Sequence, residues 1–261
     1  MGHAGGLYYE AHGPADAPAL ILSAGLGGSG GYWAPNLSAL AERHRVIVYD
    51  HRGTGKSDSA IPDPIAIDDM ARDVIALMAS IGLDRADLIG HALGGIVGLA
   101  LARIAPDRLD KLVVVNGWAK TDPVTLRCFD ARLHILNDGG PTAYLAAQPI
   151  FLFPASWIAE NGQRLDGEAA SHVAHFQPVD TLRARIAAIA AFDATPWIAD
   201  LTTPTLALGA RDDVLAPYTA SEALAAANEN FELSLMDWGG HACNVTDPDT
   251  FNRIVLDFLR S

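Results

Sequence analysis

The sequence feature that most restricts the fold is the pentapeptide Gly-His-Ala-Leu-Gly at residues 90–94. It follows an apolar run at 86–90, which predicts a buried strand, and precedes an apolar stretch at 96–104, which predicts a helix. The glycines on either side of Ala92 permit a tight strand-to-helix turn that pushes the central residue toward solvent. This is the pattern and the context of a G-x-S-x-G nucleophile elbow, with Ala92 where the reaction normally uses a serine.

Short apolar runs alternate with helix-period segments along the rest of the chain. Such runs are typical of parallel strands that are buried on both faces, with helices on each side of the sheet. Half of the 261 residues are apolar, which is enough for the core of one large α/β domain. The sequence predicts strands at 19–24, 46–50, 86–90, 112–116, 205–209 and 232–236, and helices at 68–81 and 96–104.

The strand–helix alternation stops after Trp118 and resumes near Trp197. The intervening stretch is rich in alanine and aromatic residues and is broken by prolines. A structureless loop of that length is uncommon inside a compact domain, so we expect a helical cap at 118–196. The core then comprises 1–117 and 197–261, with the cap over the strand ends, where ligands bind in open α/β sheets.

Two further segments supply polar side chains just beyond predicted strands. Asp212 and Asp213 follow the strand at 205–209, and His241 follows the last one. We expect one of the two carboxylates to orient His241 and the imidazole to act as general acid or base. The order elbow, acid, histidine is that of the α/β-hydrolase fold, which we predict for this chain, with a mostly parallel sheet and an inserted helical cap.

The glycine-rich loop at 25–30 follows the first buried strand. In this fold that loop supplies one backbone N–H of the oxyanion hole, here from Leu26, and the residue after the elbow, Leu93, supplies the other. The loop also fits the dinucleotide pattern G-x-G-x-x-G, but Asp50, the acidic residue that would follow, opens a loop typical of hydrolases instead. We therefore expect no nucleotide or other cofactor.

Composition argues against several classes of binding partner. The formal charge of −13 opposes binding to nucleic acid or to an anionic membrane, and the apolar runs are shorter than the roughly 20 residues of a membrane span. Cys128 and Cys243 have no metal-ligand spacing, so we expect no metal. The first residues lack a basic and an apolar signal region, and we expect a cytoplasmic protein.

The chain resembles the RutD family of pyrimidine-utilisation hydrolases almost from end to end. The resemblance is carried by segments of the core and, more specifically, of the cap, at 25–33, 49–55, 90–94, 115–118, 127–129, 147–155, 174–177 and 239–248. It implies that alanine is native at the elbow. It also implies hydrolysis of a carbon–nitrogen bond other than a peptide bond, in a small product of uracil breakdown. The product is carbamate, which gives ammonia and carbon dioxide, or 3-aminoacrylate, which gives malonic semialdehyde and ammonia.

Both products are small anions that decompose without a catalyst. His241 would move a proton and the N–H groups of the oxyanion hole would hold an anionic oxygen, with no covalent intermediate. An acidic protein needs a local cation to bind such a substrate, and Arg127 is the preferred candidate among the cap arginines. Asn116, Gln148 and His175 are further candidates for substrate binding.

Three other hypotheses remain open. The chain could be an engineered Ser-to-Ala variant of an ordinary serine ester or amide hydrolase. It could be a non-catalytic protein that binds a small acid, although a pseudoenzyme has no reason to keep both the acid and the histidine. It could also be a serine-independent lyase or a cofactor-free oxygenase on the same scaffold. A homodimer through an edge strand or the cap is compatible with the sequence.

Overall fold

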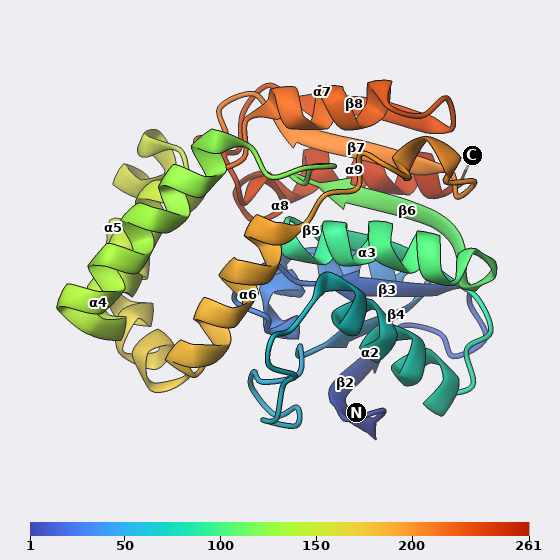
Figure 1. Cartoon of the computed structure of the whole chain (residues 1–261), viewed down its shortest axis with the longest axis horizontal. Helices are drawn as coiled ribbons and strands as arrows, with labels where there is room; N and C mark the ends of the chain where they lie inside the picture. The colour runs from blue at the N-terminus through green and yellow to red at the C-terminus, as the bar shows by residue number, and fades with distance from the viewer. Residues whose placement is uncertain (261) are drawn as a thin grey trace.

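The computed structural model describes residues 1–260, and an eight-stranded sheet forms its centre (Figure 1). The strand order is β1-β2-β4-β3-β5-β6-β7-β8, in which β3 to β8 are parallel and β2 is antiparallel to both β1 and β4. The strands are β1 (Gly2–Ala4), β2 (Leu7–His12), β3 (Ala19–Ser23), β4 (Arg45–Tyr49), β5 (Ala86–His91), β6 (Leu109–Val115), β7 (Thr205–Ala210) and β8 (Phe231–Met236).

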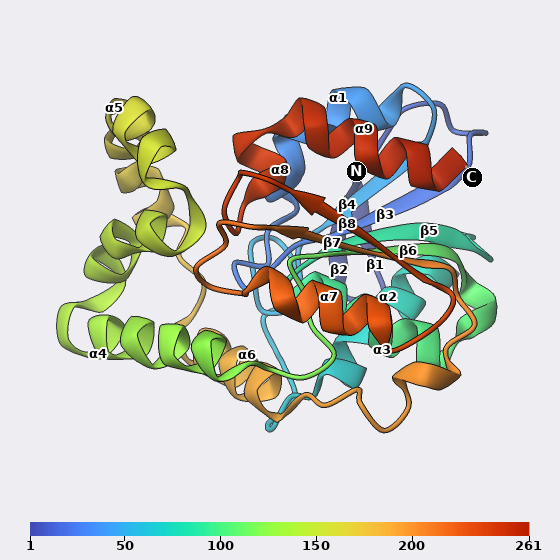
Figure 2. The same cartoon turned by 90° about the horizontal axis from the view of Figure 1, so that it is seen from above.

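Helices cover both faces of the sheet, as Figure 2 shows from above. On one face α1 (Ala34–Ala41) and α9 (Pro248–Arg260) lie side by side, and their apolar residues form one core cluster with the sheet. On the other face α2 (Ile67–Ser80), α3 (Leu93–Ile104) and α7 (Tyr218–Ala226) contribute to a second, larger cluster. A short helix, α8 (Cys243–Thr246), precedes α9.

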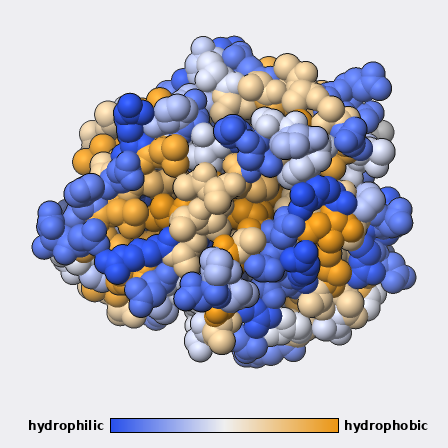
Figure 3. All heavy atoms as spheres, viewed as in Figure 1, coloured by the Kyte–Doolittle hydropathy of each residue, from blue (hydrophilic) through white to orange (hydrophobic). Residues whose placement is uncertain are grey.

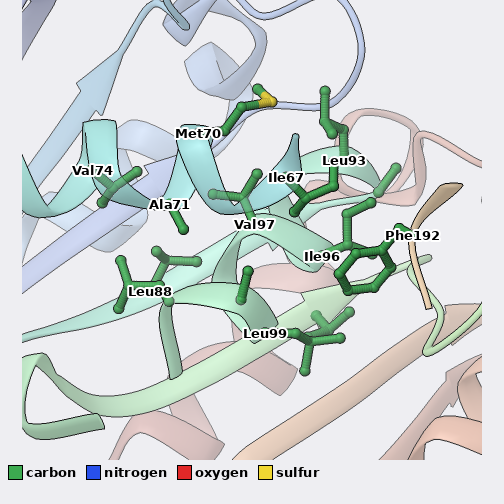
Figure 4. Close-up of a cluster of buried hydrophobic side chains, with 14 of the residues drawn as sticks. Ile67, Met70, Ala71, Val74, Leu88, Leu93, Ile96, Val97, Leu99 and Phe192 are labelled. Carbon is green, nitrogen blue, oxygen red and sulfur yellow. The ribbon is translucent and has the colours of Figure 1, made fainter. Parts of the chain in front are cut away.

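The central strand β5 and the helix α3 that follows it pack closely. Figure 4 shows Leu88 of β5 in one apolar cluster with Val97 and Leu99 of α3 and with the apolar residues of α2. Gly98 of α3 permits this approach, because a Cβ there would lie 3.0 Å from Cδ2 of Leu88 and 2.5 Å from Cδ1 of Leu112 in the neighbouring strand β6. The helix is therefore fixed against the strand whose carboxyl end carries the elbow.

The predicted sheet is confirmed in its six parallel strands, whose ends differ from the expected ranges by at most one residue, except that β6 begins three residues earlier. The sequence reading missed the two antiparallel strands β1 and β2 at the edge of the sheet. β2 has exposed and half-buried residues among its buried ones, so it lacks the continuous apolar run by which the central strands were recognised. The predicted α/β-hydrolase architecture is confirmed.

Three helices lie between β6 and β7 in the chain: α4 (Pro123–Leu152), α5 (Ala155–Ala174) and α6 (Val179–Ala191). We call them the cap. They stand beside the sheet at the carboxyl ends of the parallel strands (Figures 1 and 2). The first of them bends at Gly140, whose φ of 69° is outside the helical range, so α4 consists of an outgoing and a returning half. In the space-filling view of the same face, cap and core form one continuous surface with hydrophobic and hydrophilic residues interspersed (Figure 3).

Candidate active site

The turn between β5 and α3 has the strained backbone of a nucleophile elbow. Ala92 has φ 46° and ψ −106°, a conformation that costs a residue with a side chain about 1–3 kcal/mol. The glycines around it are sterically required, since a Cβ on Gly90 would lie 2.2 Å from the carbonyl oxygen of Gly94, and one on Gly94 would lie 2.1 Å from that of Ser23. The fold therefore maintains at considerable cost an elbow whose central residue has no hydroxyl.

Asp213 and His241 form a buried pair at the carboxyl edge of the sheet. The Nδ1 atom of His241 lies 2.7 Å from Oδ2 of Asp213. The other carboxylate oxygen, Oδ1, accepts the backbone N–H groups of Leu215 and Ala216. Both side chains of the pair are almost completely buried. This geometry fixes the imidazole and leaves its Nε2, which makes no hydrogen bond within residues 1–260, for proton exchange with a substrate.

Asp212, the other candidate acid, has a different partner. Its Oδ1 accepts the backbone N–H of Gly240 at 2.8 Å. The two neighbouring carboxylates thus hold two neighbouring residues of the β8–α8 loop, one by its backbone and one by its side chain. The acid that orients His241 is Asp213.

Two buried polar side chains donate hydrogen bonds to the backbone carbonyl oxygen of His241. The Asn116 Nδ2 donates to the carbonyl oxygen of His241 at 2.7 Å, while its Oδ1 accepts the N–H of Ala210. His91, next to Ala92 in the elbow, donates from Nε2 to the same carbonyl at 2.7 Å. Burial and the neighbouring His241 lower the pKa of His91 to about 3, so it is a neutral donor. Asn116 was expected to bind substrate, but the structure shows a buried positioning residue instead.

The loop after β3 is the one expected to contribute an N–H group to an oxyanion hole. The N–H of Leu26 donates to no acceptor within residues 1–260, and the N–H of Leu93, at the first position of α3, has no partner within its helix. The carbonyl oxygen of Leu26 is held from the cap, because Gln177 donates to it from Nε2 at 3.0 Å and Arg185 from Nη1 at 3.5 Å. Cap and oxyanion loop are therefore directly linked.

Arg185 is completely buried beneath this loop without a carboxylate partner in the described chain. Its Nη1 donates to Oγ1 of Thr54 and to Oε1 of Gln177, both at 2.7 Å, and its Nη2 donates to the carbonyl oxygen of Arg52. Burial lowers its pKa to about 10, which leaves it charged at neutral pH. From the sequence, Arg185 is only one of several cap arginines that could supply a local cation for an anionic substrate.

Of the three remaining cap candidates, two are exposed and one is half-buried beside another arginine. Arg127 is exposed and donates to the carbonyl of Pro123 in its own helix, and His175 is exposed with Nδ1 against the carbonyl of Ser171. Gln148 is half-buried, and its Oε1 accepts from Nη2 of Arg132. The structure thus places Arg127 and His175 on the exposed side of the cap, and a role for either in substrate binding stays a prediction.

The phase of α4 explains this outcome. Thr125 and Phe129 are buried, and a residue three positions after Phe129 falls on the same helix face. That residue is Arg132, whereas Arg127 falls on the opposite side. The spacing of the buried residues in the outgoing half of α4 was a sequence signal that could have identified the inward arginine.

Metal-binding clusters and membrane-spanning helices are two other features that the described residues could contain. Within residues 1–260, no group of three or more histidine, cysteine, aspartate or glutamate side chains is arranged to hold a metal ion. No helix in the same range is both long and apolar enough to cross a membrane.

The comparisons with known proteins agree with this geometry. The family model of the alpha/beta hydrolase fold matches residues 18–154. A curated relative from Caulobacter sp. (strain K31), named "Putative carbamate hydrolase RutD", is 50% identical over 256 residues, which are 97% of this chain and 96% of the relative. Among solved structures, an enol-lactonase from Burkholderia xenovorans LB400 aligns over 98% of this chain and 96% of its own, with a TM-score of 0.88 and 28% identity. A hydrolase from Pseudomonas aeruginosa PA01 covers 98% of this chain and 94% of its own, with a TM-score of 0.87 and 29% identity.

Proposed function

This chain belongs to the RutD family within the α/β-hydrolase fold, and from that premise we propose that it is a hydrolase of pyrimidine catabolism that works without a nucleophile. Its substrate is a small carboxylate-bearing product, carbamate or 3-aminoacrylate, from which nitrogen leaves as ammonia. Both cysteines are free thiols, which fits the reducing cytoplasm where we expect the protein to act.

The observation that carries the proposal is the Asp213–His241 pair beside an elbow that holds Ala92. The hydrogen bond from His241 Nδ1 to Asp213 keeps the imidazole in one orientation, so that Nε2 is the nitrogen that can take or give a proton. Positioned proton transfer of this kind contributes about 10²–10⁴ in rate. A protein that only bound a small acid would have no use for such a pair.

Neither reaction needs a covalent intermediate. In carbamate, a proton from Nε2 of His241 goes to the nitrogen, the carbon–nitrogen bond breaks with its electron pair on nitrogen, and ammonia and carbon dioxide leave. In 3-aminoacrylate, the proton goes to the carbon next to the carboxylate, and the resulting iminium ion adds water at the nitrogen-bearing carbon. Loss of ammonia then gives malonic semialdehyde.

The missing hydroxyl is consistent with such substrates. In serine hydrolases, removal of the catalytic serine leaves about 10³–10⁴ over the uncatalysed rate, from binding and the oxyanion hole. That residual catalysis is of little use for a stable ester or amide. It is sufficient for a compound that already decays by itself, because the enzyme only has to assist the proton transfer.

The test is the decay of freshly prepared carbamate and, separately, of 3-aminoacrylate near neutral pH. Each is followed by ammonia release without protein, with the protein, and with the His241→Ala variant. The exposed cap histidine provides a matched control in His175→Ala. We expect the protein and the control to accelerate at least one of the two reactions, and His241→Ala to lose most of that acceleration.

Two outcomes would contradict the proposal. If the His241→Ala variant were as fast as the unaltered protein, the buried pair would not be the catalytic group. If the protein accelerated neither reaction, the alternative of a protein that binds a small acid without converting it would be favoured.

A further inference from the structure

Arg132 is a buried guanidinium whose charge is not balanced by any carboxylate within residues 1–260. Its side chain is 5% exposed and forms no ion pair in that range. Its hydrogen bond is a long one, from Nη2 to Oε1 of Gln148 at 3.3 Å, and its Nε has no acceptor. The faces of Tyr144 and Phe151 flank it at 4.7 and 5.6 Å from the ring centroids. Aromatic rings stabilise a cation but accept no hydrogen bond in the plane of the guanidinium.

The comparison with Arg185 shows how unusual this is. Arg185 is equally buried, but both of its Nη groups donate to oxygens at 2.7 Å. A buried cation without such partners is strongly unfavourable in an otherwise apolar interior, and structures normally pair it or hydrogen-bond it. The fork of Arg132 is thus left with open donors that a planar anion would fill.

The position of Arg132 relates it to the proposed catalytic pair by two routes. On the outgoing half of α4, one turn before Arg132, the Sγ of Cys128 contacts the carbonyl of Val214, the residue after Asp213. On the returning half, Phe151 precedes Leu152, whose carbonyl accepts the N–H of Ala242, the residue after His241. The side chain of Arg132, on the outgoing half, contacts Tyr144, Gln148 and Phe151 of the returning half.

Electrostatics support this closeness. Burial raises the pKa of the Cys128 thiol, while Arg132 lowers it and Asp213 raises it. A single thiol is therefore within reach of the charges of both Arg132 and Asp213.

We propose that Arg132 is the anion-binding residue of this protein and that its guanidinium, with the Gln148 amide beside it, binds the carboxylate of the substrate. The inference rests on the proposed function, and it gives the substrate class as a small monocarboxylate whose nitrogen-bearing end faces His241. The guanidinium fork matches the two oxygens of a carboxylate, so such a pair is both charge-assisted and oriented. It also supplies the local cation that a protein of net charge −13 needs for an anionic ligand.

The experiment measures binding and is independent of turnover. The probe is acrylate, a stable carboxylate with the carbon skeleton of 3-aminoacrylate, titrated into ¹⁵N-labelled protein while the arginine Nε–H resonances are followed. The variants are Arg132→Gln, Arg132→Lys, and Arg127→Gln as the matched control, an exposed arginine on the same helix. Acrylamide, of the same size but uncharged, tests the need for the anion.

We expect acrylate to saturate the unaltered protein and the Arg127→Gln variant with the same dissociation constant and to shift the Nε–H resonance of Arg132. The dissociation constant should rise by about tenfold or more in Arg132→Gln, as for the loss of one charged hydrogen-bonded contact, and by less in Arg132→Lys. Equal binding by Arg132→Gln, or no binding by the unaltered protein, would overturn the proposal.

Two controls keep the result interpretable. If Arg132→Gln does not fold, as judged by its thermal unfolding curve, Arg132→Lys together with the resonance shift in the unaltered protein decides the question. The same titration in His241→Ala separates this inference from the proposed function: Arg132-dependent binding without turnover of carbamate or 3-aminoacrylate leaves the anion site standing and removes only the reaction.

Discussion

The core end of the site and the cap hold their polar side chains in opposite ways. At the core end, Asp213, Asn116 and His91 each have short hydrogen bonds to the loop that carries His241 or to the imidazole itself. In the cap, most charged residues are exposed, and the two inward arginines differ: both Nη groups of Arg185 donate at 2.7 Å, whereas Arg132 makes one hydrogen bond at 3.3 Å, and the Nε of each has no acceptor. Under the proposed function this difference would be a division of work, in which the core fixes the proton-transferring group and the cap binds the ligand.

The largest expected effect on the turnover number comes from substitution of Asp213. Asp213→Asn should lower the turnover number by about 10³–10⁴, because an amide no longer stabilises the tautomer and the charged form of His241. The matched variant Asp212→Asn keeps an oxygen for the N–H of Gly240 and should lose about tenfold at most. Ammonia release under saturating substrate measures both. Equal losses in the two variants would mean that the loop, and not the imidazole, depends on these acids.

The second prediction concerns the missing nucleophile. Ala92→Ser should give the protein hydrolysis of p-nitrophenyl acetate, about 10³-fold above the unaltered protein, because the strained elbow and the buried pair are already those of a serine hydrolase. Nitrophenolate release measures the gain. Turnover of the native substrate should be retained, since no step there uses a nucleophile. A variant that gains esterase activity and loses nothing separates the two chemistries, whereas no gain would show that the core end is not arranged for nucleophilic attack.

The third prediction tests the link between cap and core. Gln177→Ala removes one of the two cap donors to the carbonyl of Leu26. We expect the turnover number to fall by about tenfold with little change in KM, because a looser loop holds the oxyanion donor less well. The unfolding free energy should fall by about 2–4 kcal/mol, because the substitution also removes the Oε1 acceptor of the buried Arg185 Nη1. A change in KM alone would place Gln177 in substrate binding instead.

The fourth prediction uses the opposite end of the central strand as a reference. Asp87 lies at the amino end of β5 and is buried; burial, and then Asp110, raise its pKa to about 6 from its ordinary value of 3.8. Because the folded-state pKa is raised, the ionised carboxylate destabilises the native state, and this loss grows as the pH rises from about 4 to about 6.

The Asp87→Asn variant should therefore be more stable at pH 8, by up to about 2–3 kcal/mol, and equal to the unaltered protein near pH 4. Denaturant unfolding at the two pH values measures the difference. Turnover should not change, since this end of the strand is remote from Ala92. A stability gain that is the same at both pH values would show that the charge of Asp87 is not its cause.

The smallest effects belong to the outward cap residues. Arg127→Ala and His175→Ala should each change KM and the turnover number by less than about twofold, because both side chains are exposed and bonded only within their own helices. Steady-state kinetics suffice to test this. A clear rise in KM for Arg127→Ala would reinstate that residue as the anion-binding group and remove the contrast between the two faces of α4.

The sequence predicted the core end well because turns at strand ends have few alternatives. The segment 90–94 can only be an elbow when glycines flank its centre between a strand and a helix, and His241 follows the last strand directly. Parallel strands bring their carboxyl ends to one edge, so residues far apart in the chain meet there. What this reasoning left open was the choice between Asp212 and Asp213, which differ by a single position.

The cap was harder because its motifs give the residues and not the direction in which they face. The segment 127–129 was recognised, but the inward arginine is Arg132, and the segment 174–177 contributes Gln177 and not His175. Asn116 is a polar residue of the distinctive segment 115–118; it has a φ of 48°, and its side chain is buried and donates to the carbonyl of His241. The direction of a cap side chain depends on its rotational position around the helix, and that of Asn116 on the local backbone conformation.

By itself, therefore, the sequence determined the α/β-hydrolase fold, the absence of a hydroxyl at the elbow and the chain order of acid and histidine, because local spacing and strand periodicity encode them. Only the tertiary structure decided which carboxylate meets the imidazole and which side chains donate to the carbonyl of Leu26. It also decided which buried arginine has only one long hydrogen bond. Those choices depend on contacts between separate segments, from the 28 positions between Asp213 and His241 to the 151 between Leu26 and Gln177. Such contacts are set by the packing of strands, loops and cap helices against one another, which no local pattern records.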